Sequence, residues 1–226
     1  MVLLLAAPAT ATPWRAHVRQ AGEYAQQRAG KVSFGVRTER GLRGVAVRRT
    51  VPSASVVKAM LLVAYLRQPG VRSRRLRPDE RALLRPMIRR SDKARASQRV
   101  QHRGHLRARP AHGARADAPL PRHPAVGPVV HRRADQTRFF LRIDRYEPRC
   151  HRRFAMRLVV SIVTSQRWGI ARVRPCGWAL YFKGGWGSGS GWADRQVALL
   201  RRGRRRTRFT APVRRVRRRQ EVTVNG

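Results

Sequence analysis

The most pronounced hydrophobic pattern in the chain lies at residues 54–66, which predict a helix that is apolar nearly all round. A helix without a polar face is normally buried, so we expect this one at the centre of a domain. Ser53 precedes it as a candidate N-cap, and Pro69-Gly70 predicts its end. The positions that make it apolar are Val56, Val57, Met60, Leu61, Val63, Ala64 and Leu66.

Weaker patterns on both sides predict further helices and strands. Apolar residues at helical spacing predict helices over 13–29, about 79–88, and in two segments that contain Phe139 to Ile143 and Phe154 to Val163. Strands are predicted at 32–36, 42–47, 178–182 and 196–200. Glu39-Arg40-Gly41 favours a hairpin between the first two strands, and the last two are expected to be neighbours.

Two segments, 93–134 and 204–226, lack periodicity. The first holds ten Lys and Arg, one acidic residue and five of the seven histidines, whereas the second holds nine Arg and one acidic residue. GC-rich DNA translated in a wrong frame yields Arg, Ala, Pro, Gly and His, and helical patterning stops and resumes abruptly near 93 and 135. We therefore interpret both segments as out of frame. A genuine disordered basic linker and tail is the alternative.

The net charge of +41 introduces a second class of function. Such charge suits a nucleic acid or an anionic surface as partner. No helix-turn-helix, zinc-finger or RNA-binding signature accompanies it, so a nucleic-acid- or anionic-surface-binding protein is the alternative function. His102 and His105 have no cysteine and only Asp117 nearby, so neither a metal nor a cofactor is predicted.

The first residues and the two cysteines give expectations for the location of the protein and the state of its thiols. Residues 1–11 resemble the back half of a secretory signal with an Ala9-Thr10-Ala11 cleavage site, which predicts a secreted or cell-envelope protein; a frayed N-terminus is the alternative. No apolar run approaches the ~20 residues of a membrane-spanning helix. Cys150 and Cys176 are expected to be unpaired thiols, with a single bridge as the alternative.

Lysine is rare in this chain, and its placement points to chemistry. Only four of the 52 Lys and Arg residues are lysines, and Lys58 follows Ser55 by three positions on the predicted buried helix. The two side chains therefore share a helix face. A serine hydroxyl needs a base to become a nucleophile, and a buried lysine can lose its proton whereas arginine cannot. Ser55 also lies in the first turn, where backbone N–H groups favour developing negative charge.

Further motifs follow in the order Ser-x-x-Lys, Ser-Asp-Asn, Lys-Thr-Gly, with the second and third each one residue different. The stretches are Val51 to Met60, Arg90-Ser91-Asp92, Gln166-Arg-Trp-Gly169 and Tyr181-Phe-Lys183-Gly-Gly185-Trp-Gly187. On these motifs, residues 13–92 and 135–203 resemble the serine β-lactamase-like family, which includes the penicillin-binding proteins. The resemblance implies an α+β fold over residues 12–203, with an antiparallel sheet flanked by terminal helices and a helical subdomain beside it.

The same resemblance implies a serine hydrolase that is acylated by a β-lactam or a peptidoglycan-like amide and then hydrolysed. Ser55 would be the nucleophile, Lys58 its base or proton relay, and Ser91 a proton shuttle. The substrate-binding residues would be Lys183, which would hold a substrate carboxylate, and Gly185 and Trp186 beside it. The backbone N–H groups of Ser55 and Trp186 would form the oxyanion hole. The protein is expected to be a monomer.

The sequence also departs from the family pattern. Lys93 replaces the Asn of the second motif, and Gly184 replaces the hydroxyl residue of the third. Residues 93–134 contain no Glu to serve as the deacylating base, which predicts slow release of product. After residue 203 we expect neither the final strand nor the C-terminal helix, which would leave the sheet open at one edge. Two alternatives remain: Ser91-Asp92 as a simple helix cap, and the chain as a non-catalytic relic of the hydrolase fold.

Overall fold

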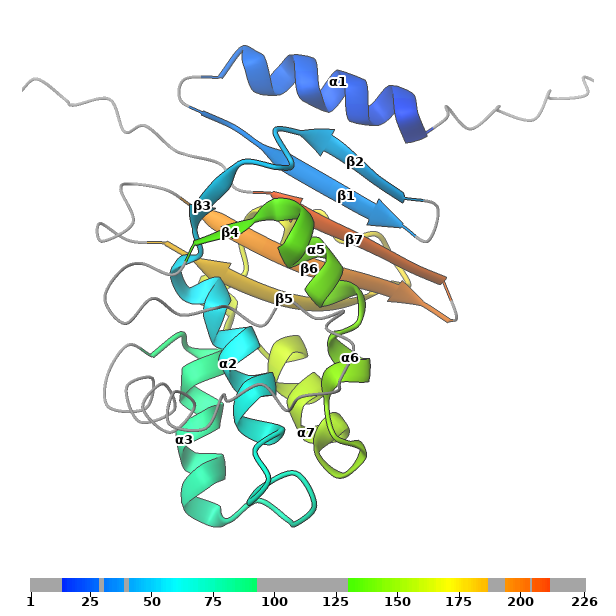
Figure 1. The fold of residues 1–226 in the computed structure, drawn as a ribbon. Helices are drawn as coiled ribbons and strands as arrows, with labels where there is room; N and C mark the ends of the chain where they lie inside the picture. Colours follow the sequence, from blue (N-terminus) through cyan, green and yellow to red (C-terminus); the bar gives the residue numbers. More distant parts are fainter. Residues whose placement is uncertain are drawn as a thin grey trace, which may run out of the picture.

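The structure is a computed structural model that describes residues 14–28, 31–38, 41–92, 130–186, 194–203 and 205–211. An antiparallel sheet lies beside a group of helices, and helix α1 (Trp14–Gln26) lies along the far edge of the sheet next to β2 (Figure 1). No helix in the described ranges has the length and apolarity needed to cross a bilayer. The predicted signal remnant at 1–11 and most of the segment 93–134 lie outside the described residues.

The main sheet has five antiparallel strands in the order β2-β1-β7-β6-β5. The predicted hairpin of β1 and β2 is confirmed, as is the pairing of the two late strands β5 and β6. The strands are β1 (Phe34–Thr38), β2 (Gly41–Val45), β5 (Ala179–Gly185), β6 (Arg195–Arg202) and β7 (Arg205–Ala211). The third motif therefore lies on an edge strand, β5.

Strand β7 corrects the expectation that no strand follows residue 203. It pairs with β6 along its length and with β1 at residues 208–210, so it joins the early hairpin to the late one. Its residues show no alternation of apolar and polar side chains, and its backbone hydrogen bonds to two neighbouring strands hold it in the sheet. The sheet is thus continuous at the point where we expected it to be open. The predicted absence of a C-terminal helix concerns residues outside the described ranges.

A second, two-stranded sheet was not predicted. Strand β3 (Thr50–Pro52) pairs with β4 (Val130–Arg132), which leads directly into α5 (Arg133–Leu141). The last residues of the segment 93–134 are therefore structured, which corrects the prediction that the whole of it is without helix or strand. This small sheet fixes the chain just before it enters the predicted buried helix.

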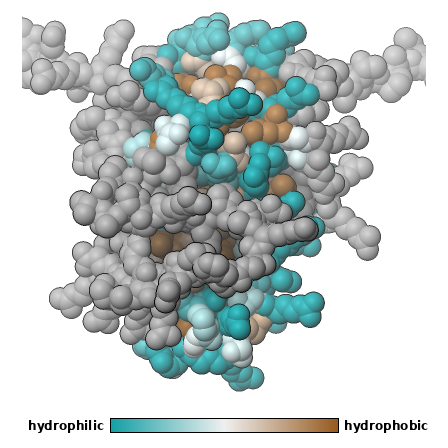
Figure 2. Space-filling view, viewed as in Figure 1, coloured by the Kyte–Doolittle hydropathy of each residue, from teal (hydrophilic) through white to brown (hydrophobic). Residues whose placement is uncertain are grey.

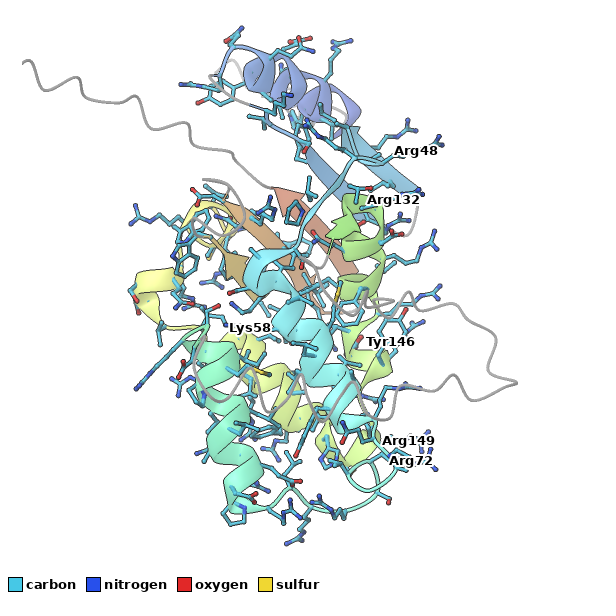
Figure 3. All side chains as sticks on the ribbon, turned by 60° about the vertical axis from the view of Figure 1, so that its left-hand side comes forward. Arg48, Lys58, Arg72, Arg132, Tyr146 and Arg149 are labelled. Carbon is cyan, nitrogen blue, oxygen red and sulfur yellow. The ribbon has the colours of Figure 1, made fainter. Side chains whose placement is uncertain are left out.

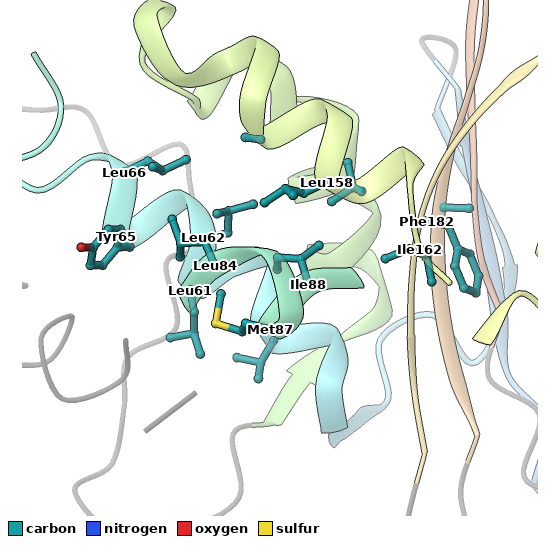
Figure 4. Packing of buried hydrophobic residues seen from close by; sticks show 14 of the residues in the cluster. Leu61, Leu62, Tyr65, Leu66, Leu84, Met87, Ile88, Leu158, Ile162 and Phe182 are labelled. Atoms are coloured by element: carbon teal, nitrogen blue, oxygen red, sulfur yellow. The ribbon is translucent and has the colours of Figure 1, made fainter. Parts of the chain in front are cut away.

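That buried helix is observed as a 3-10 turn, η1 (Ala54–Val56), followed by α2 (Val57–Leu66). Nine of the ten residues of α2 are buried, which confirms its predicted central position. The other helices are α3 (Pro78–Arg89), α6 (Ile143–Tyr146) and α7 (Arg149–Val160), with short 3-10 turns η2 (Thr164–Gln166) and η3 (Gly169–Ala171). Figure 4 shows α2 packed with α3 and α7 through side chains such as Leu62, Leu84 and Leu158.

Two apolar clusters hold the sheet and the helices together. Alternate residues of the late strands divide between them: Phe182 and Ala198 join the cluster with α3 and α7, while Val197 and Leu199 join the cluster with α5. Helix α2 and strand β6 each contribute side chains to both clusters. Hydrophilic side chains cover α1 and the lower end of the helical region (Figure 2). The predicted unpaired state of Cys150 and Cys176 is confirmed, and both are exposed.

Candidate active site

Ser55 lies in η1, where the chain enters the buried helix. The residue before it, Ala54, has a φ of +45°, an unusual conformation for a residue with a side chain. Ser53 precedes the turn as predicted, but its side chain forms no cap hydrogen bond. Backbone strain of this kind is common at functional sites, because the surrounding structure must hold it in place.

Gly185, at the end of β5, lies directly against the backbone of η1. A Cβ atom at this glycine would be 2.7 Å from the backbone nitrogen of Ser55 and 3.1 Å from that of Val56. No side chain fits there, so the glycine allows the edge strand to reach the amide of the candidate nucleophile. This contact explains the second glycine of the third motif in physical terms.

Lys58 is buried on α2 and extends to the end of α3 (Figure 3). Its Nζ donates hydrogen bonds to the backbone oxygens of Ser91, at 2.6 Å, and of Asp92, at 2.7 Å. Ser91 is also buried, and its φ of +56° is a second strained conformation in the site. Lys58 therefore holds the strained segment that carries the candidate proton shuttle.

Lys183 approaches the same serine from the sheet. Its Nζ donates to Ser91 Oγ and to the backbone oxygen of Gly184, both at 2.7 Å, and its side chain is wholly buried. Burial, and to a smaller extent the charge of Lys58, lowers the pKa of Lys183 to about 7. Lys183 is thus able to change its protonation state near neutral pH.

The loop after α7 supports Ser91 from a third side. Gln166 Nε2 donates to the backbone oxygen of Arg90, and the amide of Val163 donates to that of Arg89 at 3.1 Å. Further along, Trp168 meets Trp186 edge-to-face with ring centroids 6.2 Å apart. The motif Gln166-Arg-Trp-Gly169 therefore joins the end of α3 to the end of β5.

Arg195 is a site residue that the sequence analysis missed. In the sheet it lies opposite Gly185, and directly opposed residues of an antiparallel pair direct their side chains to the same face. The Cβ direction of Gly185 points at Ser55, so Arg195 leaves the sheet on the face of the candidate nucleophile. Only the strand register reveals this, because ten residues of sequence separate the two positions.

Two of the three guanidinium nitrogens of Arg195 are buried at the site without a hydrogen-bond partner among the described residues. Its Nε and Nη1 atoms are inaccessible and have no hydrogen-bond partner within the described part of the chain. Burial lowers its pKa, and Asp194 opposes the shift. Since arginine keeps its charge at neutral pH, Nε and Nη1 are charged donors that suit an anionic group.

The structure brings the predicted site residues together from three separate stretches of sequence. Hydrogen bonds connect Lys58 and Lys183 to Ser91, while Gly185 contacts Ser55 and Trp186 follows at the rim, 38% exposed. Lys93, the departure from the second motif, lies outside the described residues, as does the stretch 93–129 where a deacylating Glu was sought. The constellation offers a hydroxyl, two lysines and an arginine to a ligand.

Solved β-lactamase structures share this arrangement of helices and strands. A β-lactamase from Desulfarculus baarsii has a TM-score of 0.67 at 17% identity, covering 92% of this chain and 91% of the other. One from Xanthomonas campestris pv. campestris has a TM-score of 0.64 at 14% identity, covering 88% of each chain. The L2 structure complexed with relebactam has a TM-score of 0.61 at 17% identity, covering 81% and 82%.

No protein-family model and no curated protein sequence matches the chain. The likeness is therefore one of fold, and it extends over about nine tenths of the chain in the Desulfarculus comparison. It confirms the predicted fold class: helices beside an antiparallel sheet, with α1 next to the sheet edge. The chain has the serine β-lactamase-like fold.

Proposed function

We propose that the chain is a serine hydrolase that is acylated at Ser55 by a β-lactam or a related amide. The observation that carries the proposal is the convergence on Ser91. Lys58 bonds to its backbone oxygen and Lys183 to its hydroxyl, while the nearby amide of Ser55 faces Gly185. Two lysines, a second hydroxyl and an accessible backbone amide are the groups that a serine acyl transfer needs.

The first step forms a bond between Ser55 Oγ and the carbonyl carbon of the amide, and the hydroxyl proton passes to Lys58 Nζ in the molecules in which Lys58 is the neutral member of the two lysines. Two ammonium groups close to one buried serine repel each other, which favours loss of a proton from one of them. The amide C–N bond then breaks, and the proton moves through Ser91 Oγ to the departing nitrogen. Water later attacks the acyl carbon, the bond from that carbon to Ser55 Oγ breaks, and the product leaves as a carboxylic acid while a proton from the water returns to Ser55 Oγ.

The substrate class follows from the charge of the site. On the face of Ser55, Arg195 is charged at neutral pH and Lys183 is charged below its pKa of about 7, so the preferred substrate carries a carboxylate. Relebactam is the ligand of one similar structure, and the proposal extends that class of compound to this chain. A secreted or envelope location, a monomeric state and slow deacylation belong to the same proposal.

A fluorescent penicillin tests the proposal on the full chain. We expect a covalent adduct on the native protein, located on Ser55 by mass spectrometry, and no adduct on Ser55→Ala. Ser165→Ala is a matched control, because Ser165 is an exposed serine on the 3-10 turn η2 and should leave labelling unchanged. Labelling that persists in Ser55→Ala, or a native protein that is never labelled, would contradict acylation at this residue.

A further inference from the structure

An open groove of about 520 Å³ lies between α3 and α7, in the helical region. The two helices are held together beneath it by apolar side chains such as Leu84, Ile88 and Leu158 (Figure 4). Arg81, Arg85 and Arg89 line the groove from α3, and Arg153 and Arg157 line it from α7. Nothing in the proposed acyl transfer uses these residues, so the groove calls for its own explanation.

The arginines form two facing rows because of their spacing. Three lie four residues apart on α3 and two lie four residues apart on α7, so each set follows one side of its helix. Along α3 the row extends over about 12 Å, given the helical rise per residue. A ligand in the groove would therefore meet guanidinium groups from both sides along its length.

These positive charges are not neutralised within the described part of the chain. No carboxylate there forms an ion pair with any of the five arginines, and the residues that line the groove include no acid. Two of the five are oriented by backbone oxygens: Arg81 Nε donates to Leu76 at 3.3 Å and Arg89 Nε to Ser161 at 2.9 Å. Gathering like charges on two packed helices costs free energy, which an anionic ligand would recover.

We propose that this groove is a binding site for a small ligand that carries a chain of phosphate groups. Guanidinium forks bind phosphate oxygens in pairs, and arginine is the preferred residue for such planar recognition. The volume lies within the range of small-ligand sites, roughly 300–1,000 Å³. Several neighbouring arginines favour several linked anions over a single carboxylate, because each phosphate adds charge within the length of the groove.

The groove also holds one aromatic ring, which bears on the source of the phosphates. Phe154 is partly buried in its floor, and the guanidinium of Arg81 lies 5.9 Å from the ring centroid. An aromatic face and a guanidinium plane are both surfaces on which a nucleobase can stack. Inorganic polyphosphate and a nucleoside triphosphate share the phosphate chemistry, and their relative affinities distinguish them.

Calorimetric titration of the full chain with inorganic tripolyphosphate tests the site. We expect saturable binding of one tripolyphosphate per chain. The substitutions Arg85→Gln, Arg153→Gln and Arg157→Gln together should weaken it at least about tenfold, since they remove charge-assisted hydrogen bonds. All three side chains are exposed, so the variant should fold. If it does not, the single variants Arg153→Glu and Arg157→Glu carry the same test.

A matched control removes the same charge from the sheet end of the molecule. Arg48, Arg49 and Arg132 are exposed, and Figure 3 shows Arg48 and Arg132 toward the opposite end of the molecule from Arg149, the first residue of α7. Replacing all three by Gln should change the affinity by less than about twofold, because exposed distant charges are screened. An equal loss in both triple variants would show that only net charge matters, and would overturn the proposal.

Two further probes define the ligand. Tighter binding of ATP than of tripolyphosphate would support a nucleotide, and equal binding would support an inorganic chain; both outcomes require the groove arginines. Binding of a short single-stranded DNA through these arginines, with no measurable binding of tripolyphosphate or ATP, would overturn the proposal in favour of a nucleic-acid surface.

Discussion

Lys183 Nζ donates a hydrogen bond of 2.7 Å to Ser91 Oγ, and so connects the edge strand β5 to the end of α3 across 92 positions of sequence. Both partners are buried, and neither belongs to the helix that carries Ser55. The candidate active site therefore depends on how the sheet and the helical region meet. A displacement of β5 or of the end of α3 should therefore alter the position of the other through this hydrogen bond.

The pKa of Lys183, about 7, predicts pH-dependent binding of anionic substrates. Below that pH the side chain is an ammonium that attracts a substrate carboxylate, and above it the neutral amine does not. We expect the dissociation constant for benzylpenicillin to rise about three- to tenfold between pH 6 and pH 8. The Ser55→Ala variant allows the measurement, because it binds the ligand without the acylation step.

Arginine at position 183 supplies the control for this titration. The variant with both Ser55→Ala and Lys183→Arg keeps its charge throughout the range, so its dissociation constant should be independent of pH. An equally steep rise with arginine present would assign the titration to another group. A native profile that is flat would contradict the lowered pKa of Lys183.

Gly185→Ala should disable acylation, because the new Cβ would lie 2.7 Å from the backbone nitrogen of Ser55. Neither backbone can yield freely, so the strand would move away from η1 at a cost of roughly 1–3 kcal/mol of stability. We expect the acylation rate, followed with the fluorescent penicillin, to fall more than about tenfold.

Gly184→Ala is the matched control for that substitution. Its Cβ would lie 3.5 Å from the Phe182 ring and 3.7 Å from the Trp186 ring, both ordinary van der Waals contacts that leave the backbone of Ser55 untouched. The variant should keep its stability to within about 1 kcal/mol and should be acylated at a near-native rate. If both glycine variants lose acylation equally, the close approach of Gly185 to Ser55 is not the cause.

Patterns local in sequence predicted the parts of the fold that local physics decides. The all-round apolar character of α2 predicted its burial, and the short run of apolar and aromatic residues at 178–182 predicted the strand β5. Strand β7 was missed because its arginine-rich sequence has no alternation, while its position depends on pairing with β1 and β6. The local pattern of one strand does not predict which distant strands it pairs with.

The residues of the candidate site likewise fall into those that local motifs predicted and those that only the structure shows. Ser55, Lys58 and Lys183 were predicted because their motifs have fixed spacing. Arg195 was missed because its relation to Gly185 exists only in the register of the sheet. The positive φ angles of Ala54 and Ser91 were also hidden, since neither position has a glycine to indicate such a conformation.

Arg195→Gln should weaken the binding of anionic β-lactams without changing the chemical step. The lost guanidinium faces the side of Ser55 and has no other described partner for its Nε and Nη1 atoms. A hydrogen bond to a charged group contributes about 1.5–3 kcal/mol, so the dissociation constant should rise about ten- to hundredfold. The methyl ester of the same penicillin has no carboxylate, so its dissociation constant should rise much less in Arg195→Gln.

Arg202→Gln is the control on the same strand, because Arg202 is exposed at the far end of β6. It should bind the acid and the ester as the native protein does. If Arg195→Gln weakens both ligands equally, the arginine has a structural role and is not a carboxylate partner. Stopped-flow acylation at saturating substrate separates a loss of binding from a loss of the chemical step. If Arg195 only binds the carboxylate, the limiting acylation rate of Arg195→Gln should stay within about twofold of native.

Glu147 should make the protein less stable as the pH rises. It is buried between α6 and α7, and both carboxylate oxygens lack a hydrogen-bond partner among the described residues. Burial raises its pKa from 4.5 to about 8, against the opposing charges of Arg67 and Arg152. Between these two pKa values the unfolded chain has released a proton that the folded chain keeps. The free energy of unfolding contributed by this group therefore falls from pH 4.5 to pH 8.

Glu147→Gln removes that dependence, because the amide is neutral at every pH. At pH 4 the carboxyl is largely protonated in both states, so the variant should differ little from the native protein. At pH 7 it should be more stable by up to roughly 3 kcal/mol, at about 1.4 kcal/mol per pH unit above 4.5. Urea unfolding of both proteins from pH 4 to pH 8 measures the difference.

Glu23→Gln, at an exposed carboxylate on α1, is the control and should show no such trend with pH. A stability difference for Glu147→Gln that stays constant over this range would mean that the carboxyl is already ionised in the folded protein, and that a group not yet identified neutralises it.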